Sequence, residues 1–75
     1  MLHELIEIKP DVANGMPVVK GTRITVRSVL ELLAAGDDVD EVLAAYPSIT
    51  REQVLACVEV AARMMGNSYS ALPLA

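Results

Sequence analysis

The residues best suited to chemistry lie in the stretch PVVKGTRITV, residues 17–26, where Lys20 and Arg23 bracket Gly21 and Thr22. A Lys-Gly-Thr string invites comparison with phosphate-binding loops. A P-loop, however, needs an earlier glycine followed by a Gly-Lys pair, and here the order is Lys-Gly without that glycine. A glycine between two β-branched runs is typical of a tight turn. The spacing therefore argues against a nucleotide-binding loop and indicates a turn that carries two positive charges.

Arg27 extends this charge, since residues 18–30 hold Lys20, Arg23 and Arg27 but no acid. Contact with a nucleic-acid backbone needs only charge and reach, so we predict that these three residues touch DNA phosphates. The rest of the chain argues against general nucleic-acid binding, because the net charge is −4. Residues 31–62 carry seven acids against Arg51 alone.

Residue types that would support a metal site or catalysis are sparse. His3 is the only histidine and lies near a terminus, and Cys57 is the only cysteine. A metal site needs three or four clustered ligands, and the acids at residues 37–41 are explained by helix capping. No nucleophile, base and orienting group form a set. We therefore predict no metal, no cofactor and no enzymatic activity.

The elements that position the charged turn begin with a β-ribbon. The segment LIEI, residues 5–8, predicts a strand, Asn14-Gly15 predicts a turn, and residues 17–19 and 24–26 are β-branched runs on either side of the charged turn. Two or three short strands of this kind need something to pack against.

Three helices are predicted after the ribbon. The first covers about residues 26–35, with Thr25 as N-cap and Gly36 at its end. The second starts at a capping box formed by Asp38 and Glu41 and ends before a proline at position 47; the third starts at a second capping box, Thr50 and Gln53. We expect the third helix to end at Gly66. The predicted fold is mainly α: a three-helix, helix-turn-helix-like domain with a short N-terminal β-ribbon.

The predicted third helix carries two neighbouring apolar stripes. The broader one predicts the face that packs on the core, and it contains Val54, Leu55, Val58, Ala61, Ala62 and Met65. The second contains Cys57, Val60 and Met64. A helix with two apolar stripes usually meets two neighbours, so we predict that Cys57, Val60 and Met64 form a dimer or partner interface, or else pack against the C-terminal tail. This leaves Ala56 toward solvent.

The second and third helices are joined by a short turn, which is the layout of a helix-turn-helix motif. In that motif the start of the second helix enters the major groove, which would bring Arg51 and Gln53 near base edges. The same layout also fits an ordinary helical corner, and Glu52 and Glu59 on this helix would repel phosphates. If DNA is bound, we expect the charged turn to contribute more than the third helix.

Size and composition complete the expectations. The chain has 75 residues, which corresponds to one domain over residues 1–66 followed by a loose tail at residues 67–75. Hydrophobic residues make up 53% and aromatic residues 3%, and so high an apolar share in a small chain favours a homodimer. No segment is long enough to span a membrane, and the N-terminus is not that of a signal peptide, so we predict a cytoplasmic protein.

The sequence resembles the Domain of Unknown Function 433 family over about residues 5–65. The resemblance is carried by the block Gly-x-Pro-Val-Val-Lys-Gly-Thr-Arg-Ile at residues 15–24, by Leu-Leu-Ala-Ala-Gly, and by Glu-Val-Leu-Ala-Ala-Tyr-Pro-x-Ile-Thr at residues 41–50. It implies a bacterial helix-turn-helix-like domain similar to VapB-type antitoxins. Such proteins bind a PIN-like ribonuclease toxin and usually operator DNA as well.

Two functions therefore remain as hypotheses. The first is an antitoxin of a type II toxin-antitoxin pair that neutralises a PIN-like ribonuclease and binds operator DNA for autoregulation. The second is a homodimeric protein-interaction module without DNA binding, which the acidic third helix favours. Where relatives often have a second glycine after Gly15, this chain has Met16.

Overall fold

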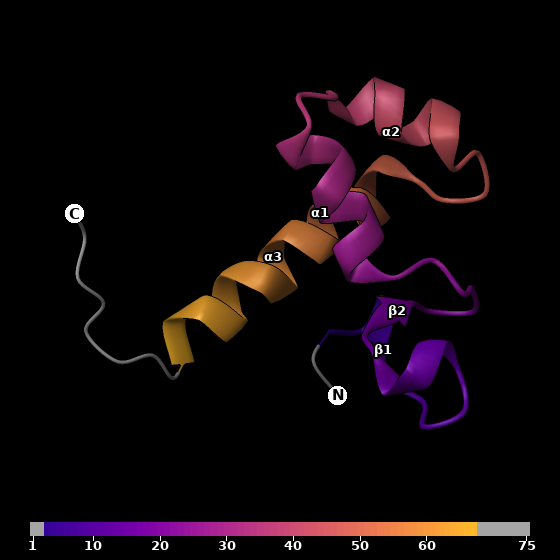
Figure 1. Ribbon diagram of the computed structural model, residues 1–75, viewed down its shortest axis with the longest axis vertical. Coiled ribbons are helices and arrows are strands. Elements are labelled where there is room, and N and C mark those ends of the chain that lie inside the picture. Colours follow the sequence, from indigo (N-terminus) through magenta and orange to yellow (C-terminus); the bar gives the residue numbers. More distant parts are fainter. Residues whose placement is uncertain (1–2, 68–75) are drawn as a thin grey trace.

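The computed structural model describes residues 3–67 of the chain. Its elements are the strand β1 (Ile6–Glu7), the 3-10 turn η1 (Ala13–Gly15), the strand β2 (Val18–Val19) and the helices α1 (Val26–Ala34), α2 (Val39–Ala45) and α3 (Arg51–Asn67). In Figure 1, α1 and α2 form the upper part and the two strands the lower part, while α3 crosses α1 and then projects to the lower left. The predicted mainly α fold, three helices after a short β-ribbon, is confirmed.

The β-ribbon consists of one antiparallel pair in which Ile6 lies opposite Val19 and Glu7 lies opposite Val18. Beyond the charged turn, the predicted strand at residues 24–26 is reduced to a single bridge between Thr25 and Val18. It stops there because Val26 already begins α1. A sheet of this size is not stable alone and depends on packing against the rest of the chain. Accordingly, Ile6, Val18 and Val19 are all fully buried.

Side-chain caps define the helix starts, as the sequence predicts. Thr25 Oγ1 accepts the Ser28 N–H at 3.0 Å at the start of α1. The Asp38–Glu41 box is complete at the start of α2, with bonds of 2.8 and 2.9 Å. The predicted second box is also present, since Thr50 N–H donates to Gln53 Oε1 at 2.8 Å and Gln53 N–H donates to Thr50 Oγ1 at 3.2 Å. These caps satisfy backbone donors that a helix leaves unpaired.

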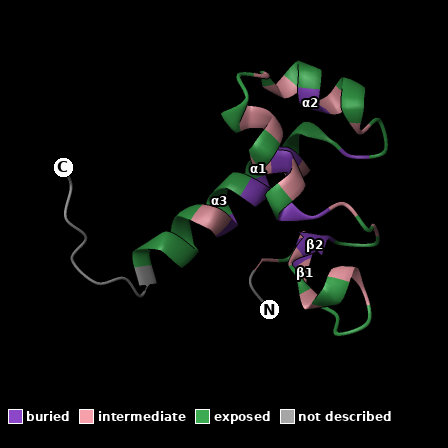
Figure 2. Cartoon of the chain, viewed as in Figure 1, coloured by how far each residue is buried: buried purple, intermediate pink, exposed green. Residues whose placement is uncertain are grey.

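The core lies where α3 passes beneath the other elements. Buried side chains from β1, β2, α1, α2 and the α2–α3 turn meet one face of α3, and in Figure 2 the purple segments gather around this crossing. The α3 face in the core consists of Val54, Ala56, Cys57 and Val60. The predicted assignment of faces is therefore correct for Val54 but wrong for most of the helix, including Ala56, which was expected to face solvent and is buried. The stripe expected in the core is largely exposed, with Leu55 at 54%, Val58 at 41% and Met65 at 67%.

The C-terminal end of α3 also differs from the prediction. The helix continues through Gly66 to Asn67, because a glycine in a helix costs only about 1 kcal/mol relative to alanine and breaks it only where a turn competes. Of the predicted tail, residues 68–75 lie outside the described part of the chain. Within residues 3–67, no helix combines the length and the apolar character that crossing a membrane requires.

Candidate functional site

The charged turn after β2 is closed by the chain's own carboxylate. Thr22 N–H donates to the Val19 carbonyl at 2.9 Å, and Gly21 has a φ of 78°, the backbone conformation that this position of a type II turn requires. The Gly21 N–H donates to Glu7 Oε2 at 2.9 Å. The backbone donor that a phosphate would seek is therefore already bound by an anion from β1. This geometry agrees with the reading of the block as a turn.

Two basic side chains project from this turn and a third follows on α1. Lys20 and Arg23 are exposed, and neither forms an ion pair with any of the described residues. Arg27 is also exposed and lies 3.8 Å, Nε to Oε1, from Glu31 one turn along α1. We call Lys20, Arg23 and Arg27 the basic patch. All three side chains are accessible to a phosphate backbone. The Arg27–Glu31 pair does not prevent this for Arg27, because exposed ion pairs are weak.

The other predicted DNA-binding residues lie at the start of α3 and are engaged within the chain. Arg51 Nη2 lies 2.7 Å from Asp40 Oδ1 of α2, and Gln53 uses its Oε1 as the capping acceptor for Thr50. The Arg51–Asp40 pair joins α3 to α2, and the Gln53–Thr50 bond caps the N-terminus of α3. Both interactions stabilise the corner between the two helices. The structure thus separates the five predicted residues into an open basic patch and an engaged helix start.

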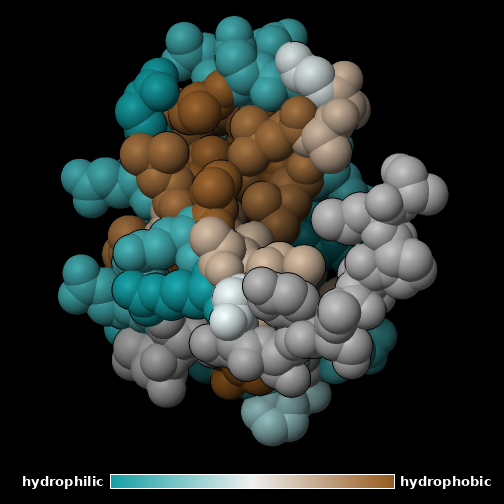
Figure 3. Space-filling model, turned by 90° about the vertical axis from the view of Figure 1, so that its left-hand side faces the viewer, coloured by the Kyte–Doolittle hydropathy of each residue, from teal (hydrophilic) through white to brown (hydrophobic). Residues whose placement is uncertain are grey.

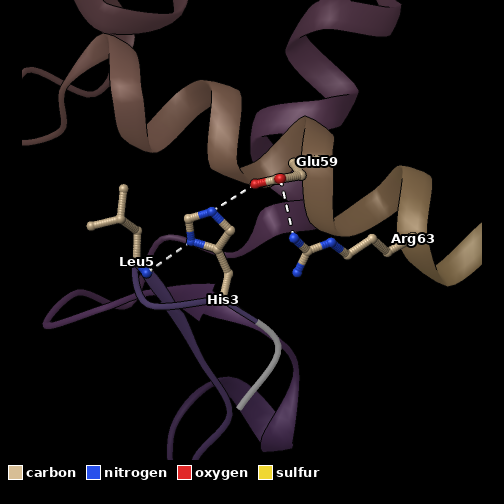
Figure 4. A network of polar contacts seen from close by, with 4 residues as sticks. All are labelled: His3, Leu5, Glu59 and Arg63. Atoms are coloured by element: carbon tan, nitrogen blue, oxygen red, sulfur yellow. Dashed lines mark hydrogen bonds and ion pairs between the residues drawn. The ribbon is translucent and has the colours of Figure 1, made fainter.

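The N-terminal segment is attached to the middle of α3 by a small polar network (Figure 4). His3 Nδ1 accepts the Leu5 N–H at 3.0 Å, and the ring proton therefore lies on Nε2, which is 2.7 Å from Glu59 Oε2. Arg63 Nη2 lies 3.2 Å from the other oxygen of Glu59. The sequence predicts no role for His3, because no periodic pattern connects residues so far apart along the chain.

An apolar groove opens between α1 and the end of α3. It has a volume of about 480 Å³ and is lined by Pro17, Val26, Arg27, Leu30, Glu31, Ala34, Ala61, Met64 and Met65. Figure 3 views the molecule from the side toward which α3 projects and shows apolar side chains gathered over a broad area of that face, with hydrophilic ones above it. We call the cavity lined by these nine residues the α1–α3 groove. Arg27 belongs both to its rim and to the basic patch.

The predicted partner interface must be corrected in part. Cys57 is 0% and Val60 is 1% exposed, so both pack inside the chain and cannot contact another molecule. The third predicted residue, Met64, is 50% exposed and lines the groove. Val60 and Met64 lie one turn apart on nearly the same side of α3, but the rest of the chain covers only Val60. Periodicity indicates which residues share a face, not where the neighbouring element ends.

Several groove residues could not be found from the sequence. Leu30 and Ala34 are one turn apart on α1, where Ala34 is exposed and Leu30 only half-buried. The one signal in the sequence that pointed to an exposed apolar surface was its excess of apolar residues over what one small core can hold. Within residues 3–67, no three His, Cys, Asp or Glu side chains gather in a group suited to a metal ion.

Comparison with known proteins agrees with this fold. The family model described as "Protein of unknown function (DUF433)" matches residues 6–61. An uncharacterised protein of Sinorhizobium fredii, y4eO, is 41% identical over 52 residues, which are 69% of this chain and 24% of that protein. A crystal structure of a DUF433 member from Anabaena variabilis superposes with a TM-score of 0.79 at 30% identity, covering 88% of this chain and 65% of that one.

The chain belongs to the DUF433 family, because the family model matches well over half of it. It also spans about a quarter of the length of the Sinorhizobium relative and about two thirds of the Anabaena chain. The predicted resemblance is thereby confirmed at the level of family and fold.

Proposed function

We propose that the chain is the antitoxin of a bacterial type II toxin-antitoxin pair and neutralises a PIN-like ribonuclease by binding it. In this proposal the chain is not an enzyme, needs no cofactor, and acts in the cytoplasm. The observation that carries it is the α1–α3 groove, an apolar concave surface at the edge of a small domain. Apolar surfaces of this kind mark sites of interaction with other proteins.

The charge of the chain supports a basic partner. A ribonuclease must attract RNA, so the surface around its active site is expected to be positive. The helical part of this chain is rich in acids, and the exposed ones include Glu31, Asp38, Asp40, Glu41, Glu52 and Glu59. Glu31 lies on the rim of the groove itself. The acidic helices would attract a basic protein and disfavour acidic ones, although on the groove's own rim Glu31 is accompanied by Arg27.

Operator DNA is the second proposed ligand, and the basic patch is the surface that suits it. Lys20, Arg23 and Arg27 are exposed on the loop that precedes α1 and on its first turn. Arg51 and Gln53 are less suited to reading bases, because Asp40 and Thr50 already hold their polar atoms. We therefore expect phosphate contacts that give affinity with little sequence preference from this chain alone.

The alternative is a homodimeric protein-interaction module that binds no DNA. It is favoured by the engaged start of α3 and by the acids that follow it, since Glu52 and Glu59 would face the phosphates in a helix-turn-helix complex. The two functions share the requirement for an apolar interaction surface. They differ in whether the basic patch has a ligand.

Inhibition of the ribonuclease tests the antitoxin proposal. The proposal requires a PIN-like ribonuclease as partner, expected to be encoded in the neighbouring gene, and this enzyme would be assayed on a single-stranded RNA with increasing amounts of chain. We expect stoichiometric inhibition by the wild type and by Ala44→Glu, which adds a charge to an exposed position near the end of α2. Ala34→Glu, which adds the same charge at the end of α1 inside the groove, should inhibit far less.

The design separates the groove from the rest of the chain. Both alanines are exposed helix-end positions, so the two variants should fold alike and differ only in where the carboxylate lies. Full activity of the ribonuclease in the presence of excess wild-type chain would contradict the antitoxin proposal. Equal inhibition by both variants would exclude the groove as the binding surface.

A further inference from the structure

The α1–α3 groove lies beside the point where the described part of the chain ends. One of its walls is the last part of α3, with Ala61, Met64 and Met65. Met64 is 50% and Met65 is 67% exposed, so residues 3–67 leave both side chains largely uncovered. The helix ends at Asn67, three residues after Met64, and residues 68–75 continue the chain from there. The segment that follows α3 therefore starts within one helical turn of the groove.

The charges of the groove restrict the chemistry of its occupant. Only two of the nine lining residues are charged, Arg27 and Glu31, and their Nε and Oε1 atoms lie 3.8 Å apart. Their charges offset each other on the rim, and the other seven lining residues are apolar. A charged group placed among these seven would lose hydration without gaining a free partner of opposite charge. The groove therefore fits an uncharged, apolar segment best.

Residues 68–75 have this chemistry. Their sequence is Ser-Tyr-Ser-Ala-Leu-Pro-Leu-Ala, which contains no charged residue and places Leu72 and Leu74 on either side of Pro73. A proline disfavours the helical conformation at the residue before it and favours an extended one. Side chains two residues apart in an extended segment point to the same side. Leu72 and Leu74 can therefore enter one apolar groove together.

The segment is long enough to bring these leucines into the groove. Between Ala61 and Asn67, α3 rises roughly 9 Å. Five residues of extended chain, from Asn67 to Leu72, span up to about 17 Å, so the segment can reverse its direction after α3 and return to the level of Ala61. The groove volume of about 480 Å³ lies within the range of roughly 300–1,000 Å³ that is typical of ligand pockets. Reach and volume thus both permit the contact.

Covalent attachment favours this occupant over a separate molecule. A segment joined to its binding site by a few residues is present there at an effective concentration in the millimolar range. A second copy of the chain at a micromolar concentration would need roughly a thousand-fold higher affinity to compete on equal terms. Even a weak apolar contact between the segment and the groove is therefore populated.

We infer that residues 68–75 fold back onto the α1–α3 groove of their own chain, with Leu72 and Leu74 packed against Leu30, Ala34 and Met64. One consequence rests on the proposed function, because the segment then competes with the ribonuclease for the same groove. If the segment closes the groove in about nine-tenths of the molecules, the apparent affinity for the ribonuclease falls about tenfold. The segment is then a cover that the partner must displace.

Methyl contacts in the full chain test the inference without any ribonuclease. Nuclear Overhauser effects, which report on methyl groups in close contact, should join Leu72 and Leu74 to Leu30 and Ala34. Their absence from the spectra of the wild type would overturn the inference. In a mixture of isotope-labelled and unlabelled chains, filtered spectra should lose these contacts. Contacts that persist between labelled and unlabelled chains would assign the segment to the groove of a second copy and would overturn its placement on its own chain.

Two double variants separate the leucines from the rest of the segment. Leu72→Asp with Leu74→Asp should release the segment and shift the methyl signal of Met64. The matched control is Ser68→Asp with Ser70→Asp, which adds the same two charges to the same segment and should leave that signal near its wild-type position. Both pairs of substitutions lie outside the core of residues 3–67, so both variants should fold. A wild-type Met64 signal in the leucine variant, or equal shifts in both variants, would overturn the inference.

Ribonuclease binding tests the competition and keeps the two proposals apart. In calorimetric titrations, the leucine variant should bind the ribonuclease about tenfold more tightly than the wild type if the segment closes the groove as above. Unchanged affinity of this variant, despite methyl contacts in the wild type, would overturn the competition. Methyl contacts without ribonuclease binding by any variant would support the docked segment and contradict only the proposed function. Ribonuclease binding without methyl contacts would contradict only the docked segment.

Discussion

At the scale of single residues, Cys57 shows how burial determines chemistry in this protein. Its side chain is fully buried in the core, and loss of hydration of the charged form raises the pKa of the thiol from 9.0 to about 11. The thiolate is the reactive form of cysteine, so a thiol in this position is inert at neutral pH. Cys57 therefore serves packing in the core.

We expect the Cys57 thiol to report unfolding. At about pH 8, iodoacetamide should alkylate the folded chain at least ~100-fold more slowly than the chain in urea, because a pKa of about 11 in place of 9.0 lowers the thiolate fraction by that factor. Mass spectrometry would follow the adduct over time. Similar rates with and without urea would contradict the burial of Cys57.

The same burial predicts the sign of a pH effect on stability. Between about pH 9 and 11, the unfolded chain loses the thiol proton while the folded chain keeps it, so the free energy of unfolding falls as the pH rises through this window. Urea unfolding at several pH values would measure the slope. Cys57→Ala removes the titrating group and should make the slope shallower than in the wild type; an unchanged slope would contradict this cause.

At the scale of elements, the contribution of each α3 residue to stability depends on whether other parts of the chain cover it. Val60 is 1% exposed and Met64 is 50% exposed, although they are one turn apart. Val60→Ala should lower the free energy of unfolding by about 2 kcal/mol through lost contacts and a cavity. Met64→Ala should change it by less than about 0.5 kcal/mol. Urea unfolding of both variants would show the difference, and equal losses would mean that the core extends along the whole helix.

The local signals of the sequence were sufficient to locate the helix starts. Thr25, Asp38 and Thr50 cap their helices as predicted, because a cap depends on residues within one turn. The face of α3 that packs inward was not predictable in this way. Two apolar arcs of similar strength compete on this helix, and only the packing of the other elements against α3 decides that Val60 is buried and Val58 is not.

The candidate site was predictable to a similar extent. The basic patch can be predicted from the sequence alone, since Lys20, Arg23 and Arg27 lie close together along the chain. The α1–α3 groove joins residues about thirty positions apart and depends on how two helices cross. The contact between His3 and Glu59 spans an even longer stretch of chain. Long-range pairs of this kind leave no periodic trace in one sequence.

At the scale of the whole molecule, an acidic chain with a small basic patch has two surfaces of opposite charge. The net charge of −4 favours a basic protein partner, while the basic patch is the surface on which DNA phosphates meet least repulsion. Both proposed interactions should weaken as salt increases, because salt screens exposed charges beyond about 10 Å at 0.1 M. Loss of the apolar contact in the groove, in contrast, should weaken only the protein complex.

Operator binding can be tested through its salt dependence. Gel shifts with DNA from upstream of the gene should show a complex whose affinity falls steeply with salt, by a slope of about −0.9 per phosphate contact. Replacing Lys20, Arg23 and Arg27 together by alanine should reduce that slope by up to about 2.7 if each contacts a phosphate. The control is Arg51→Ala, whose side chain is already paired with Asp40 and should matter less. No shift at low salt, with or without the ribonuclease, would favour the module without DNA binding.

The most direct test of the central claim is a calorimetric titration of the PIN-like ribonuclease with this chain. We expect tight binding by the wild type and by Ala44→Glu. Ala34→Glu should bind about 100-fold more weakly, a loss of roughly 2.7 kcal/mol, because a carboxylate would be buried without a partner in the α1–α3 groove. No heat of binding with the wild type, or equal affinities for Ala34→Glu and Ala44→Glu, would contradict the claim that the groove holds the toxin.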